Sequence, residues 1–223
     1  MPASASRRGW VAALRRFASG TPEAAPAARC DLCSSVIPPG HRHLLDIDTR
    51  RLCCACHACA LLFQARQDGR YRLIPQGGTR LDREQVRISD AQWEALRVPV
   101  DIAFFFTSTP QARVVAMYPG PAGATESLLD LDAWDGILAA NPALADLQPD
   151  VEALLVDRSA GARECYRVPI DRCFALAGAL RSCWQGFSGG PEVRETLRAF
   201  LDELAAVSAQ HRAPPLTHAG AAQ

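Results

Sequence analysis

The sequence predicts an α+β protein, in which a small cysteine-rich module precedes an antiparallel sheet packed with about three to four helices. Three observations carry this prediction. Six of the nine cysteines lie within residues 30–59. Beyond them, apolar runs of strand length occur in pairs, and stretches with helical periodicity lie between and after these pairs. Strands that pair as hairpins favour an antiparallel sheet, and we expect the helices to cover one side of it.

Four segments divide the 223 residues. Residues 1–29 are rich in Arg, Ala and Pro, and we interpret them as a flexible tail, with a docking peptide for an acidic partner as the alternative. Residues 30–75 form the cysteine module, and residues 76–208 form the α+β domain. Residues 209–223 form a second, disordered tail. A chain of this length can bury the cores of two such parts.

Three strand segments are expected inside the cysteine module. Residues 44–48 have the composition of a short strand. Residues 60–63 form an apolar run that is expected to continue, across a turn at Asp68 and Gly69, into a strand at residues 71–74. A Gly-containing turn between two apolar runs predicts a hairpin.

The α+β domain is expected to begin with a capped helix and to end with two amphipathic helices. Ser89 and Asp90 can cap the first helix, and Pro191 lies in the first turn of the last one. The apolar residues of the last helix recur at helical spacing and form one stripe. In chain order, the expected elements are a helix at 91–96, strands at 101–107 and 113–118, a Gly/Pro loop at 119–123, a helix at 131–140, a hairpin at 151–156 and 164–168, and helices near 173–184 and 191–207.

The charges of the chain balance, but they are unevenly distributed. All 24 basic residues are Arg and 24 residues are acidic, so the formal net charge is zero. A dedicated nucleic-acid-binding protein usually carries a basic excess, and nucleic acid is therefore not the expected partner. Residues 114–157 contain eight acidic residues and no basic one. We interpret this acidic block as a solvated face, with a surface for a basic partner as the alternative.

The sequence shows no membrane or export signal. No apolar run approaches the roughly 18–20 residues of a membrane span, and no apolar signal core follows the N-terminal arginines. We therefore expect a cytoplasmic protein. In a reducing cytosol, clustered cysteines indicate a metal site rather than a disulfide framework.

Two C-x2-C pairs carry the clearest chemistry in the sequence. Cys30 and Cys33 form the first pair, and Cys56 and Cys59 form the second one 22 residues later. Each pair can fold into a knuckle that brings both sulfurs to one side of a tight turn. Two facing knuckles supply the four thiolates that tetrahedral Zn²⁺ prefers, at about 2.3 Å, so the spacing predicts a zinc-ribbon-like site with four cysteine ligands. Because four protein ligands leave no position for water, the pattern favours a structural metal and points away from an enzyme.

Neighbouring residues leave the ligand set and the metal open. Cys54 or His43 could replace one of the four ligands. Iron, alone or in an iron–sulfur cluster, is the alternative metal. Knuckles that bind a single iron usually carry Gly after the second cysteine, and Ser34 and Ala60 stand there in this sequence, which favours zinc.

No other motif forms a catalytic constellation. The Gly/Pro-rich residues 118–127 could cradle an anion, but their acidic neighbours favour a structural turn. Cys165 and Cys173 are interpreted as buried thiols, because no histidine lies between residues 58 and 210 to activate either one.

Several stretches together carry a resemblance to a known family. They are residues 30–33 (CDLC), 41–46 (HRHLLD), 54–63 (CACHACALLF), 104–106 (FFF), 118–127 (YPGPAGATES) and 188–192 (SGGPE). Over about residues 29–205, the chain resembles an uncharacterised, mainly actinobacterial domain family encoded beside genes for an actinobacterial-type, oxygen-tolerant nickel–iron hydrogenase. The resemblance implies an accessory role and assigns no catalytic residue. The family pattern includes Cys54 beside the second knuckle.

These observations lead to one functional expectation and two alternatives. We expect a non-catalytic, zinc-stapled accessory protein that assists assembly or maturation of a nickel–iron hydrogenase, or binds it as a peripheral subunit. The first alternative is an iron or iron–sulfur electron-transfer protein for the same enzyme. The second is a regulator that binds nucleic acid through the zinc ribbon, which the zero net charge disfavours.

Overall fold

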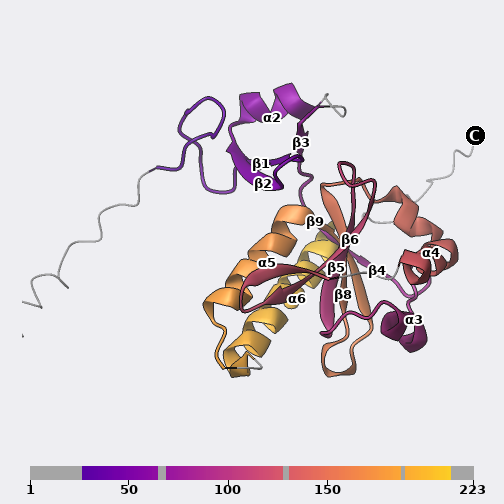
Figure 1. Ribbon diagram of the computed structural model, residues 1–223. Helices are drawn as coiled ribbons and strands as arrows, with labels where there is room; N and C mark the ends of the chain where they lie inside the picture. Colours follow the sequence, from indigo (N-terminus) through magenta and orange to yellow (C-terminus); the bar gives the residue numbers. More distant parts are fainter. Residues whose placement is uncertain (1–26, 65–68, 128–130, 187–188, 212–223) are drawn as a thin grey trace, which may run out of the picture.

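The computed structural model of the chain confirms the α+β class (Figure 1). It describes residues 27–64, 69–127, 131–186 and 189–211, so most of the two expected tails lies outside the described residues. A three-stranded antiparallel sheet has the order β2-β1-β3, and a six-stranded antiparallel sheet has the order β4-β9-β8-β5-β6-β7. None of the described helices has both the length and the apolar content that a bilayer span requires.

The cysteine module contains the small sheet and one helix. Its elements are β1 (Arg42–Asp46), β2 (Arg51–Ala55), α2 (His57–Gln64) and β3 (Tyr71–Leu73). The expected strand at 60–63 is wrong, because these residues belong to α2. The N–H of Ala60 donates to the carbonyl of Cys56 at 2.9 Å, so a helical turn starts directly at the second knuckle. A short apolar run is compatible with a helix as well as with a strand. Here the run is helical because the second knuckle forms the first turn of the helix.

The α+β domain contains the large sheet and four α-helices. Its elements are β4 (Thr79–Leu81), α3 (Asp90–Ala95), β5 (Ile102–Ser108), β6 (Arg113–Gly120), β7 (Gly123–Ser127), α4 (Leu131–Ala140), the 3-10 helix η1 (Pro142–Asp146), β8 (Glu152–Asp157), the 3-10 turn η2 (Ser159–Gly161), β9 (Glu164–Pro169), α5 (Ile170–Ser182) and α6 (Gly190–His211). The expected hairpins β5–β6 and β8–β9 are both antiparallel pairs.

The expected Gly/Pro loop at 119–123 is instead part of a further hairpin of the sheet, β6–β7. β6 runs on to Gly120, which pairs with Gly123 at the start of β7, and a two-residue turn joins them. Pro119 is tolerated because β5 pairs with β6 only as far as Met117, so one side of Pro119 needs no ladder hydrogen bond. Gly123 has a φ of +100°, a region that residues with a side chain rarely adopt.

Helices cover both faces of the large sheet, and the expectation of one covered face is wrong. Phe104 and Phe106 lie in the core on the side of α5 and α6, whereas Phe105 lies in the core on the side of α3 and α4. The two pairs of helices flank the sheet in Figure 1. All six residues of β8 are buried. The continuous apolar runs of β5 and β8 make both faces of these strands apolar. Helices therefore have to pack on both faces of the sheet.

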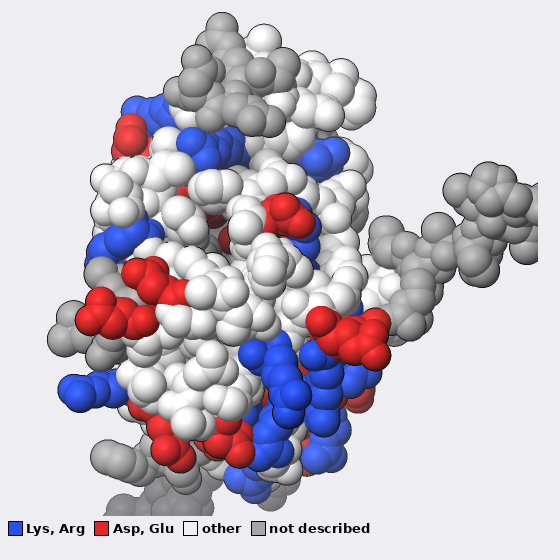
Figure 2. Space-filling view, turned by 90° about the vertical axis from the view of Figure 1, so that its right-hand side faces the viewer, with Lys and Arg blue, Asp and Glu red and all other residues white. Residues whose placement is uncertain are grey.

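The acidic block at 114–157 is only in part a solvated face, because Glu126, Asp132, Asp135 and Asp146 are exposed but other acidic residues are not. Asp150, Glu152 and Asp157 are buried, and Glu152 accepts from Nε of Arg167 at 2.8 Å. The face in Figure 2 carries acidic and basic side chains next to one another. The basic residues missing from the block are supplied by other segments of the chain, because folding brings distant charges together.

Two buried residues of the cysteine module join the hydrophobic core of the α+β domain on the side of α5 and α6. Leu45 and Ile74 of the module pack in the same cluster as the residues of the large sheet and of α5 and α6. Polar contacts support this joint: Nδ1 of His43 lies 2.7 Å from Oδ2 of Asp171, and NH1 of Arg72 lies 2.7 Å from Oδ2 of Asp150. By contrast, the module's own core holds four buried residues, Leu44, Cys53, Ala55 and Ala60.

The expected cap of α3 is confirmed and gives a first testable prediction. Oγ of Ser89 accepts from the N–H of Gln92 at 3.2 Å, and the side chain of Gln92 accepts from the N–H of Ser89 at 2.9 Å. Replacing Ser89 with alanine removes one of these bonds, so we expect Ser89→Ala to lower the free energy of unfolding by about 1 kcal/mol in urea denaturation. Ser89→Thr keeps a cap and should unfold near the wild type. Equal stability of Ser89→Ala and the wild type would contradict the capping role.

Candidate metal centre

The two knuckles bring four cysteine sulfurs together. The Sγ atoms of Cys30, Cys33, Cys56 and Cys59 all lie within 4.8 Å of one another, and those of Cys33 and Cys56 are 3.6 Å apart. The tight turns therefore place all four sulfurs of the two C-x2-C pairs around one point. Such a cluster could bind a metal ion.

The first knuckle is a tight turn closed by backbone hydrogen bonds. The N–H of Ser34 donates to the carbonyl of Cys30, and the N–H of Cys30 donates to the carbonyl of Ser35, each at 2.8 Å. Ser34 adopts a φ of +62°, which lets the chain turn back directly after Cys33. An isolated β-bridge between Arg29 and Val36 closes the base of this turn. Cys33 and Cys30 are thus held by the backbone of their own segment.

The second knuckle joins the end of β2 to the start of α2. The N–H of Cys59 points at Sγ of Cys56, 3.5 Å away, and donates to it. Because this N–H belongs to the first turn of the helix, it has no acceptor within the helix and can donate to the sulfur. The position of Cys56 relative to Cys59 therefore follows from the start of α2.

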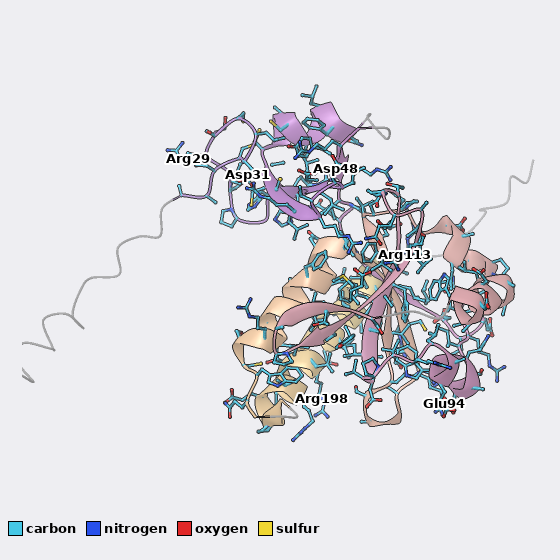
Figure 3. All side chains as sticks on the ribbon, viewed as in Figure 1. Arg29, Asp31, Asp48, Glu94, Arg113 and Arg198 are labelled. Carbon is cyan, nitrogen blue, oxygen red and sulfur yellow. The ribbon has the colours of Figure 1, made fainter. Side chains whose placement is uncertain are left out.

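Asp31 locks the two knuckles to each other. Its N–H donates to the carbonyl of Cys54 at 2.8 Å, and its Oδ2 accepts from the N–H of Cys54 at 2.6 Å. Figure 3 shows Asp31 in the first knuckle, beside the small sheet. The two cysteine pairs are thus held close together by these two hydrogen bonds between Asp31 and Cys54.

The thiols of Cys33 and Cys59 differ in their ease of ionisation. The hydroxyl of Ser35, 3.3 Å from Sγ of Cys33, and the N–H of Ser35 lower the pKa of Cys33 to about 6. Burial and then hydrogen bonding to the neighbouring sulfurs raise the pKa of Cys59 to about 12. Four thiolates this close repel one another unless a cation lies between them, so the donor set fits a divalent metal ion that prefers sulfur.

The two alternative ligands from the sequence lie in a different cluster. Cys54 and His43 face each other across β1 and β2, and they gather with His41 rather than with the four cysteines. The strand alternation explains this, because Cys53, next to Cys54, is buried in the module core, and Cys54 therefore points to the other side. Sequence reasoning missed His41, which directly precedes β1 and whose ring centroid lies 5.0 Å from that of His43.

The other residues considered from the sequence, Cys165, Cys173 and residues 118–127, belong to the folded framework of the domain. Cys165 and Cys173 are buried, and burial raises the pKa of Cys165 to about 11 and that of Cys173 further. Thiols with raised pKa values are poor nucleophiles. Residues 118–127, considered as an anion cradle, form the β6–β7 hairpin.

The fold and the site define an α+β protein with a four-cysteine cluster that could hold a metal ion, anchored on a six-stranded antiparallel sheet. Over residues 29–208, the chain matches a family of unknown function, DUF5947, and it belongs to that family. The matched region begins just before the first knuckle and ends within α6. No curated protein and no solved structure matches the chain.

Proposed function

We propose that the protein is a non-catalytic accessory protein, in which zinc bound by Cys30, Cys33, Cys56 and Cys59 holds a zinc-ribbon-like module in shape for a protein partner. The observation that carries this proposal is the gathering of four sulfurs within 4.8 Å on a module whose own core is small. A metal bound by four protein side chains has no open position for substrate, and its binding free energy stabilises the fold.

The same four sulfurs would also suit iron, which is the basis of the alternative function. An iron or iron–sulfur centre in this cluster would make the protein an electron-transfer partner. Ser34 and Ala60, which follow the second cysteine of each knuckle, favour zinc in our proposal. A nucleic-acid-binding role has less support, because the formal net charge is zero and acidic side chains lie among the basic ones in Figure 2.

Exposed apolar side chains of the module support a protein partner. In the part of the chain that the structure describes, the large hydrophobic side chains that stand out in solvent are Val36, Leu61 and Leu62, which are 60%, 53% and 61% exposed. Val36 follows the first knuckle, and the two leucines lie on α2 directly after the second one. Apolar side chains that gather on one small module are typical of a contact surface for another protein.

The partner that we propose is a subunit of a nickel–iron hydrogenase or the precursor of one. This step rests on the sequence resemblance, which implies an accessory role for such an enzyme. The module surface around the knuckles is the proposed contact site, because the exposed apolar side chains lie there. In the acidic block, by contrast, Glu126, Asp150 and Glu152 already pair with arginines of this chain.

A co-expression experiment tests the proposal. The tagged chain is co-expressed with the hydrogenase subunits, and we expect it to retain one of them during purification. The double variant Leu61→Ser/Leu62→Ser should weaken this binding by about 10-fold or more, because exposed apolar side chains at a contact each contribute of the order of 1 kcal/mol.

The control for this experiment is Arg198→Ala, because Figure 3 places Arg198 at the end of the molecule opposite the module. It should bind like the wild type, and the double variant should keep its metal. Failure of the wild type to retain any hydrogenase subunit, or full binding by the double variant, would contradict the proposed partner or the proposed surface, respectively.

A further inference from the structure

A second cluster of metal-binding side chains lies on the cysteine module, apart from the four cysteines. One ring nitrogen each of His41 and His43 and the Sγ of Cys54 all lie within 4.8 Å of one another. The ring centroids of His41, which directly precedes β1, and His43 lie 5.0 Å apart, and Cys54 is the direct cross-strand neighbour of His43. The pairing of β1 with β2 thus assembles the cluster from two segments.

Both histidine rings are held in the same protonation pattern. Nδ1 of His41 lies 3.0 Å from the carbonyl oxygen of Pro38, and Nδ1 of His43 lies 2.7 Å from Oδ2 of Asp171. Each partner is an acceptor, so each Nδ1 carries the proton and donates. In the neutral form of each ring, Nε2 then carries the lone pair with which histidine binds a metal.

Nε2 of His41 is the observation that points to a ligand. This atom is buried and has no hydrogen-bond partner. Buried polar atoms in folded proteins are nearly always paired, and an unpaired acceptor beside a second imidazole and a thiol is the arrangement that a cation completes. The partners of the two Nδ1 atoms, a carbonyl and a carboxylate, are those that usually orient metal-bound histidines.

We propose that His41, His43 and Cys54 form a second metal site, which binds a divalent transition-metal ion such as Zn²⁺ through two imidazole nitrogens and one thiolate. On binding, Cys54 gives up its thiol proton to solvent, and the histidines bind as neutral rings. Three protein ligands leave the fourth tetrahedral position to water or to a ligand from outside. The side chain of His43 is 33% exposed, so one side of the cluster borders solvent.

The two sites therefore differ in kind. The four-cysteine cluster is closed by its own ligands, whereas the second site is open and suits an ion that exchanges. Asp171 belongs to α5 and contacts the site across the joint between the module and the α+β domain. It is a positioning residue, because it would act on the metal through His43. This site is independent of the identity of any protein partner.

Zinc titration of the full chain tests the second site. The protein is prepared with its tightly bound metal and then titrated with Zn²⁺ in competition with a chromophoric chelator. We expect the wild type to bind one further equivalent. His41→Ala and Cys54→Ala should lose that equivalent and keep the first one. The matched controls His57→Ala and Cys53→Ala change a neighbouring histidine and a neighbouring cysteine outside the cluster, and both should keep the second equivalent.

Two further readouts keep the test decisive if a variant folds poorly. With Co²⁺ in the wild type, thiolate-to-metal absorption from the second equivalent should be clearly weaker than from the first, because one thiolate is bound instead of four. Asp171→Asn should keep the stoichiometry but weaken the second equivalent by about 10- to 100-fold. A wild type that binds no second equivalent, or a His41→Ala variant that binds it as tightly, would overturn the proposal.

Discussion

Replacing Cys30 with serine is expected to release the metal and to unfold the cysteine module. Cys30 is 2% exposed and lies at the start of the first knuckle, so a water molecule cannot easily take its place. Metal binding at a structural four-ligand site supplies about 10 kcal/mol, which is comparable to the whole stability of a small domain. The four buried residues of the module's own core cannot replace that free energy.

Hydrogen exchange measured by mass spectrometry, together with metal content, checks this prediction. In Cys30→Ser, amides of β1, β2 and α2 should lose protection, while amides of β5 and β8 in the large sheet should keep most of theirs. Cys183→Ser is the matched control, because Cys183 lies at the end of α5, away from the cluster, and should keep the metal and the protection pattern. A metal-free Cys30→Ser chain with wild-type protection in the module would show that the cluster is not needed for the fold.

The second large effect is expected at Asp150, which links the α+β domain to the module. Its carboxylate is buried and accepts from the N–H and the hydroxyl of Thr109 at 2.8 and 2.7 Å, and it pairs with Arg72 of β3. Asp150→Ala leaves Arg72, whose side chain is 20% exposed, without its ion-pair partner. Removing one member of a buried ion pair costs about 3–5 kcal/mol, and we expect a value near the lower end because Arg72 still contacts water.

Urea denaturation of the metal-loaded protein measures this loss. Asp150 also has a φ of +67°, a conformation that Asp and Asn tolerate better than Ala. Asp150→Asn therefore keeps the backbone conformation while it removes the charge, and it should lie between the wild type and Asp150→Ala. A loss below about 1 kcal/mol for Asp150→Ala would mean that the contact with Arg72 contributes little to the joint.

Local sequence signals predicted the parts of this structure that depend on neighbouring residues. The cap at Ser89 and the hairpin between β8 and β9 each depend on a short segment, and both are present. The spacing of Cys30 and Cys33 likewise predicts the tight turn that brings their sulfurs together. Such features are visible in the sequence because their hydrogen bonds and turns involve residues a few positions apart.

Features that depend on long-range pairing could not be predicted in the same way. β7 has a polar sequence, Gly123–Ser127, and it becomes a strand because β6 offers a free edge. The apolar run at Leu61 and Leu62 is helical because a knuckle starts the helix. The burial of Asp150 depends on Arg72, which lies far away in the chain, in the cysteine module.

The second cluster illustrates the same limit at the site itself. His43 and Cys54 were both candidates for the four-cysteine site, and no spacing rule separates the two roles. The register of β1 against β2 separates the two roles, because it places Cys54 opposite His43, and both side chains gather with His41 instead of with the four cysteines. The contact between His43 and Asp171, 128 positions apart, requires the joint between the module and the α+β domain.

The most direct test of the central claim is elemental analysis of anaerobically purified protein, combined with its visible spectrum. The account predicts a colourless protein with at least one tightly bound zinc per chain, and loss of that zinc in Cys56→Ser. Iron in place of zinc, with thiolate charge-transfer bands in the visible spectrum, would contradict the structural zinc site and make electron transfer the leading function.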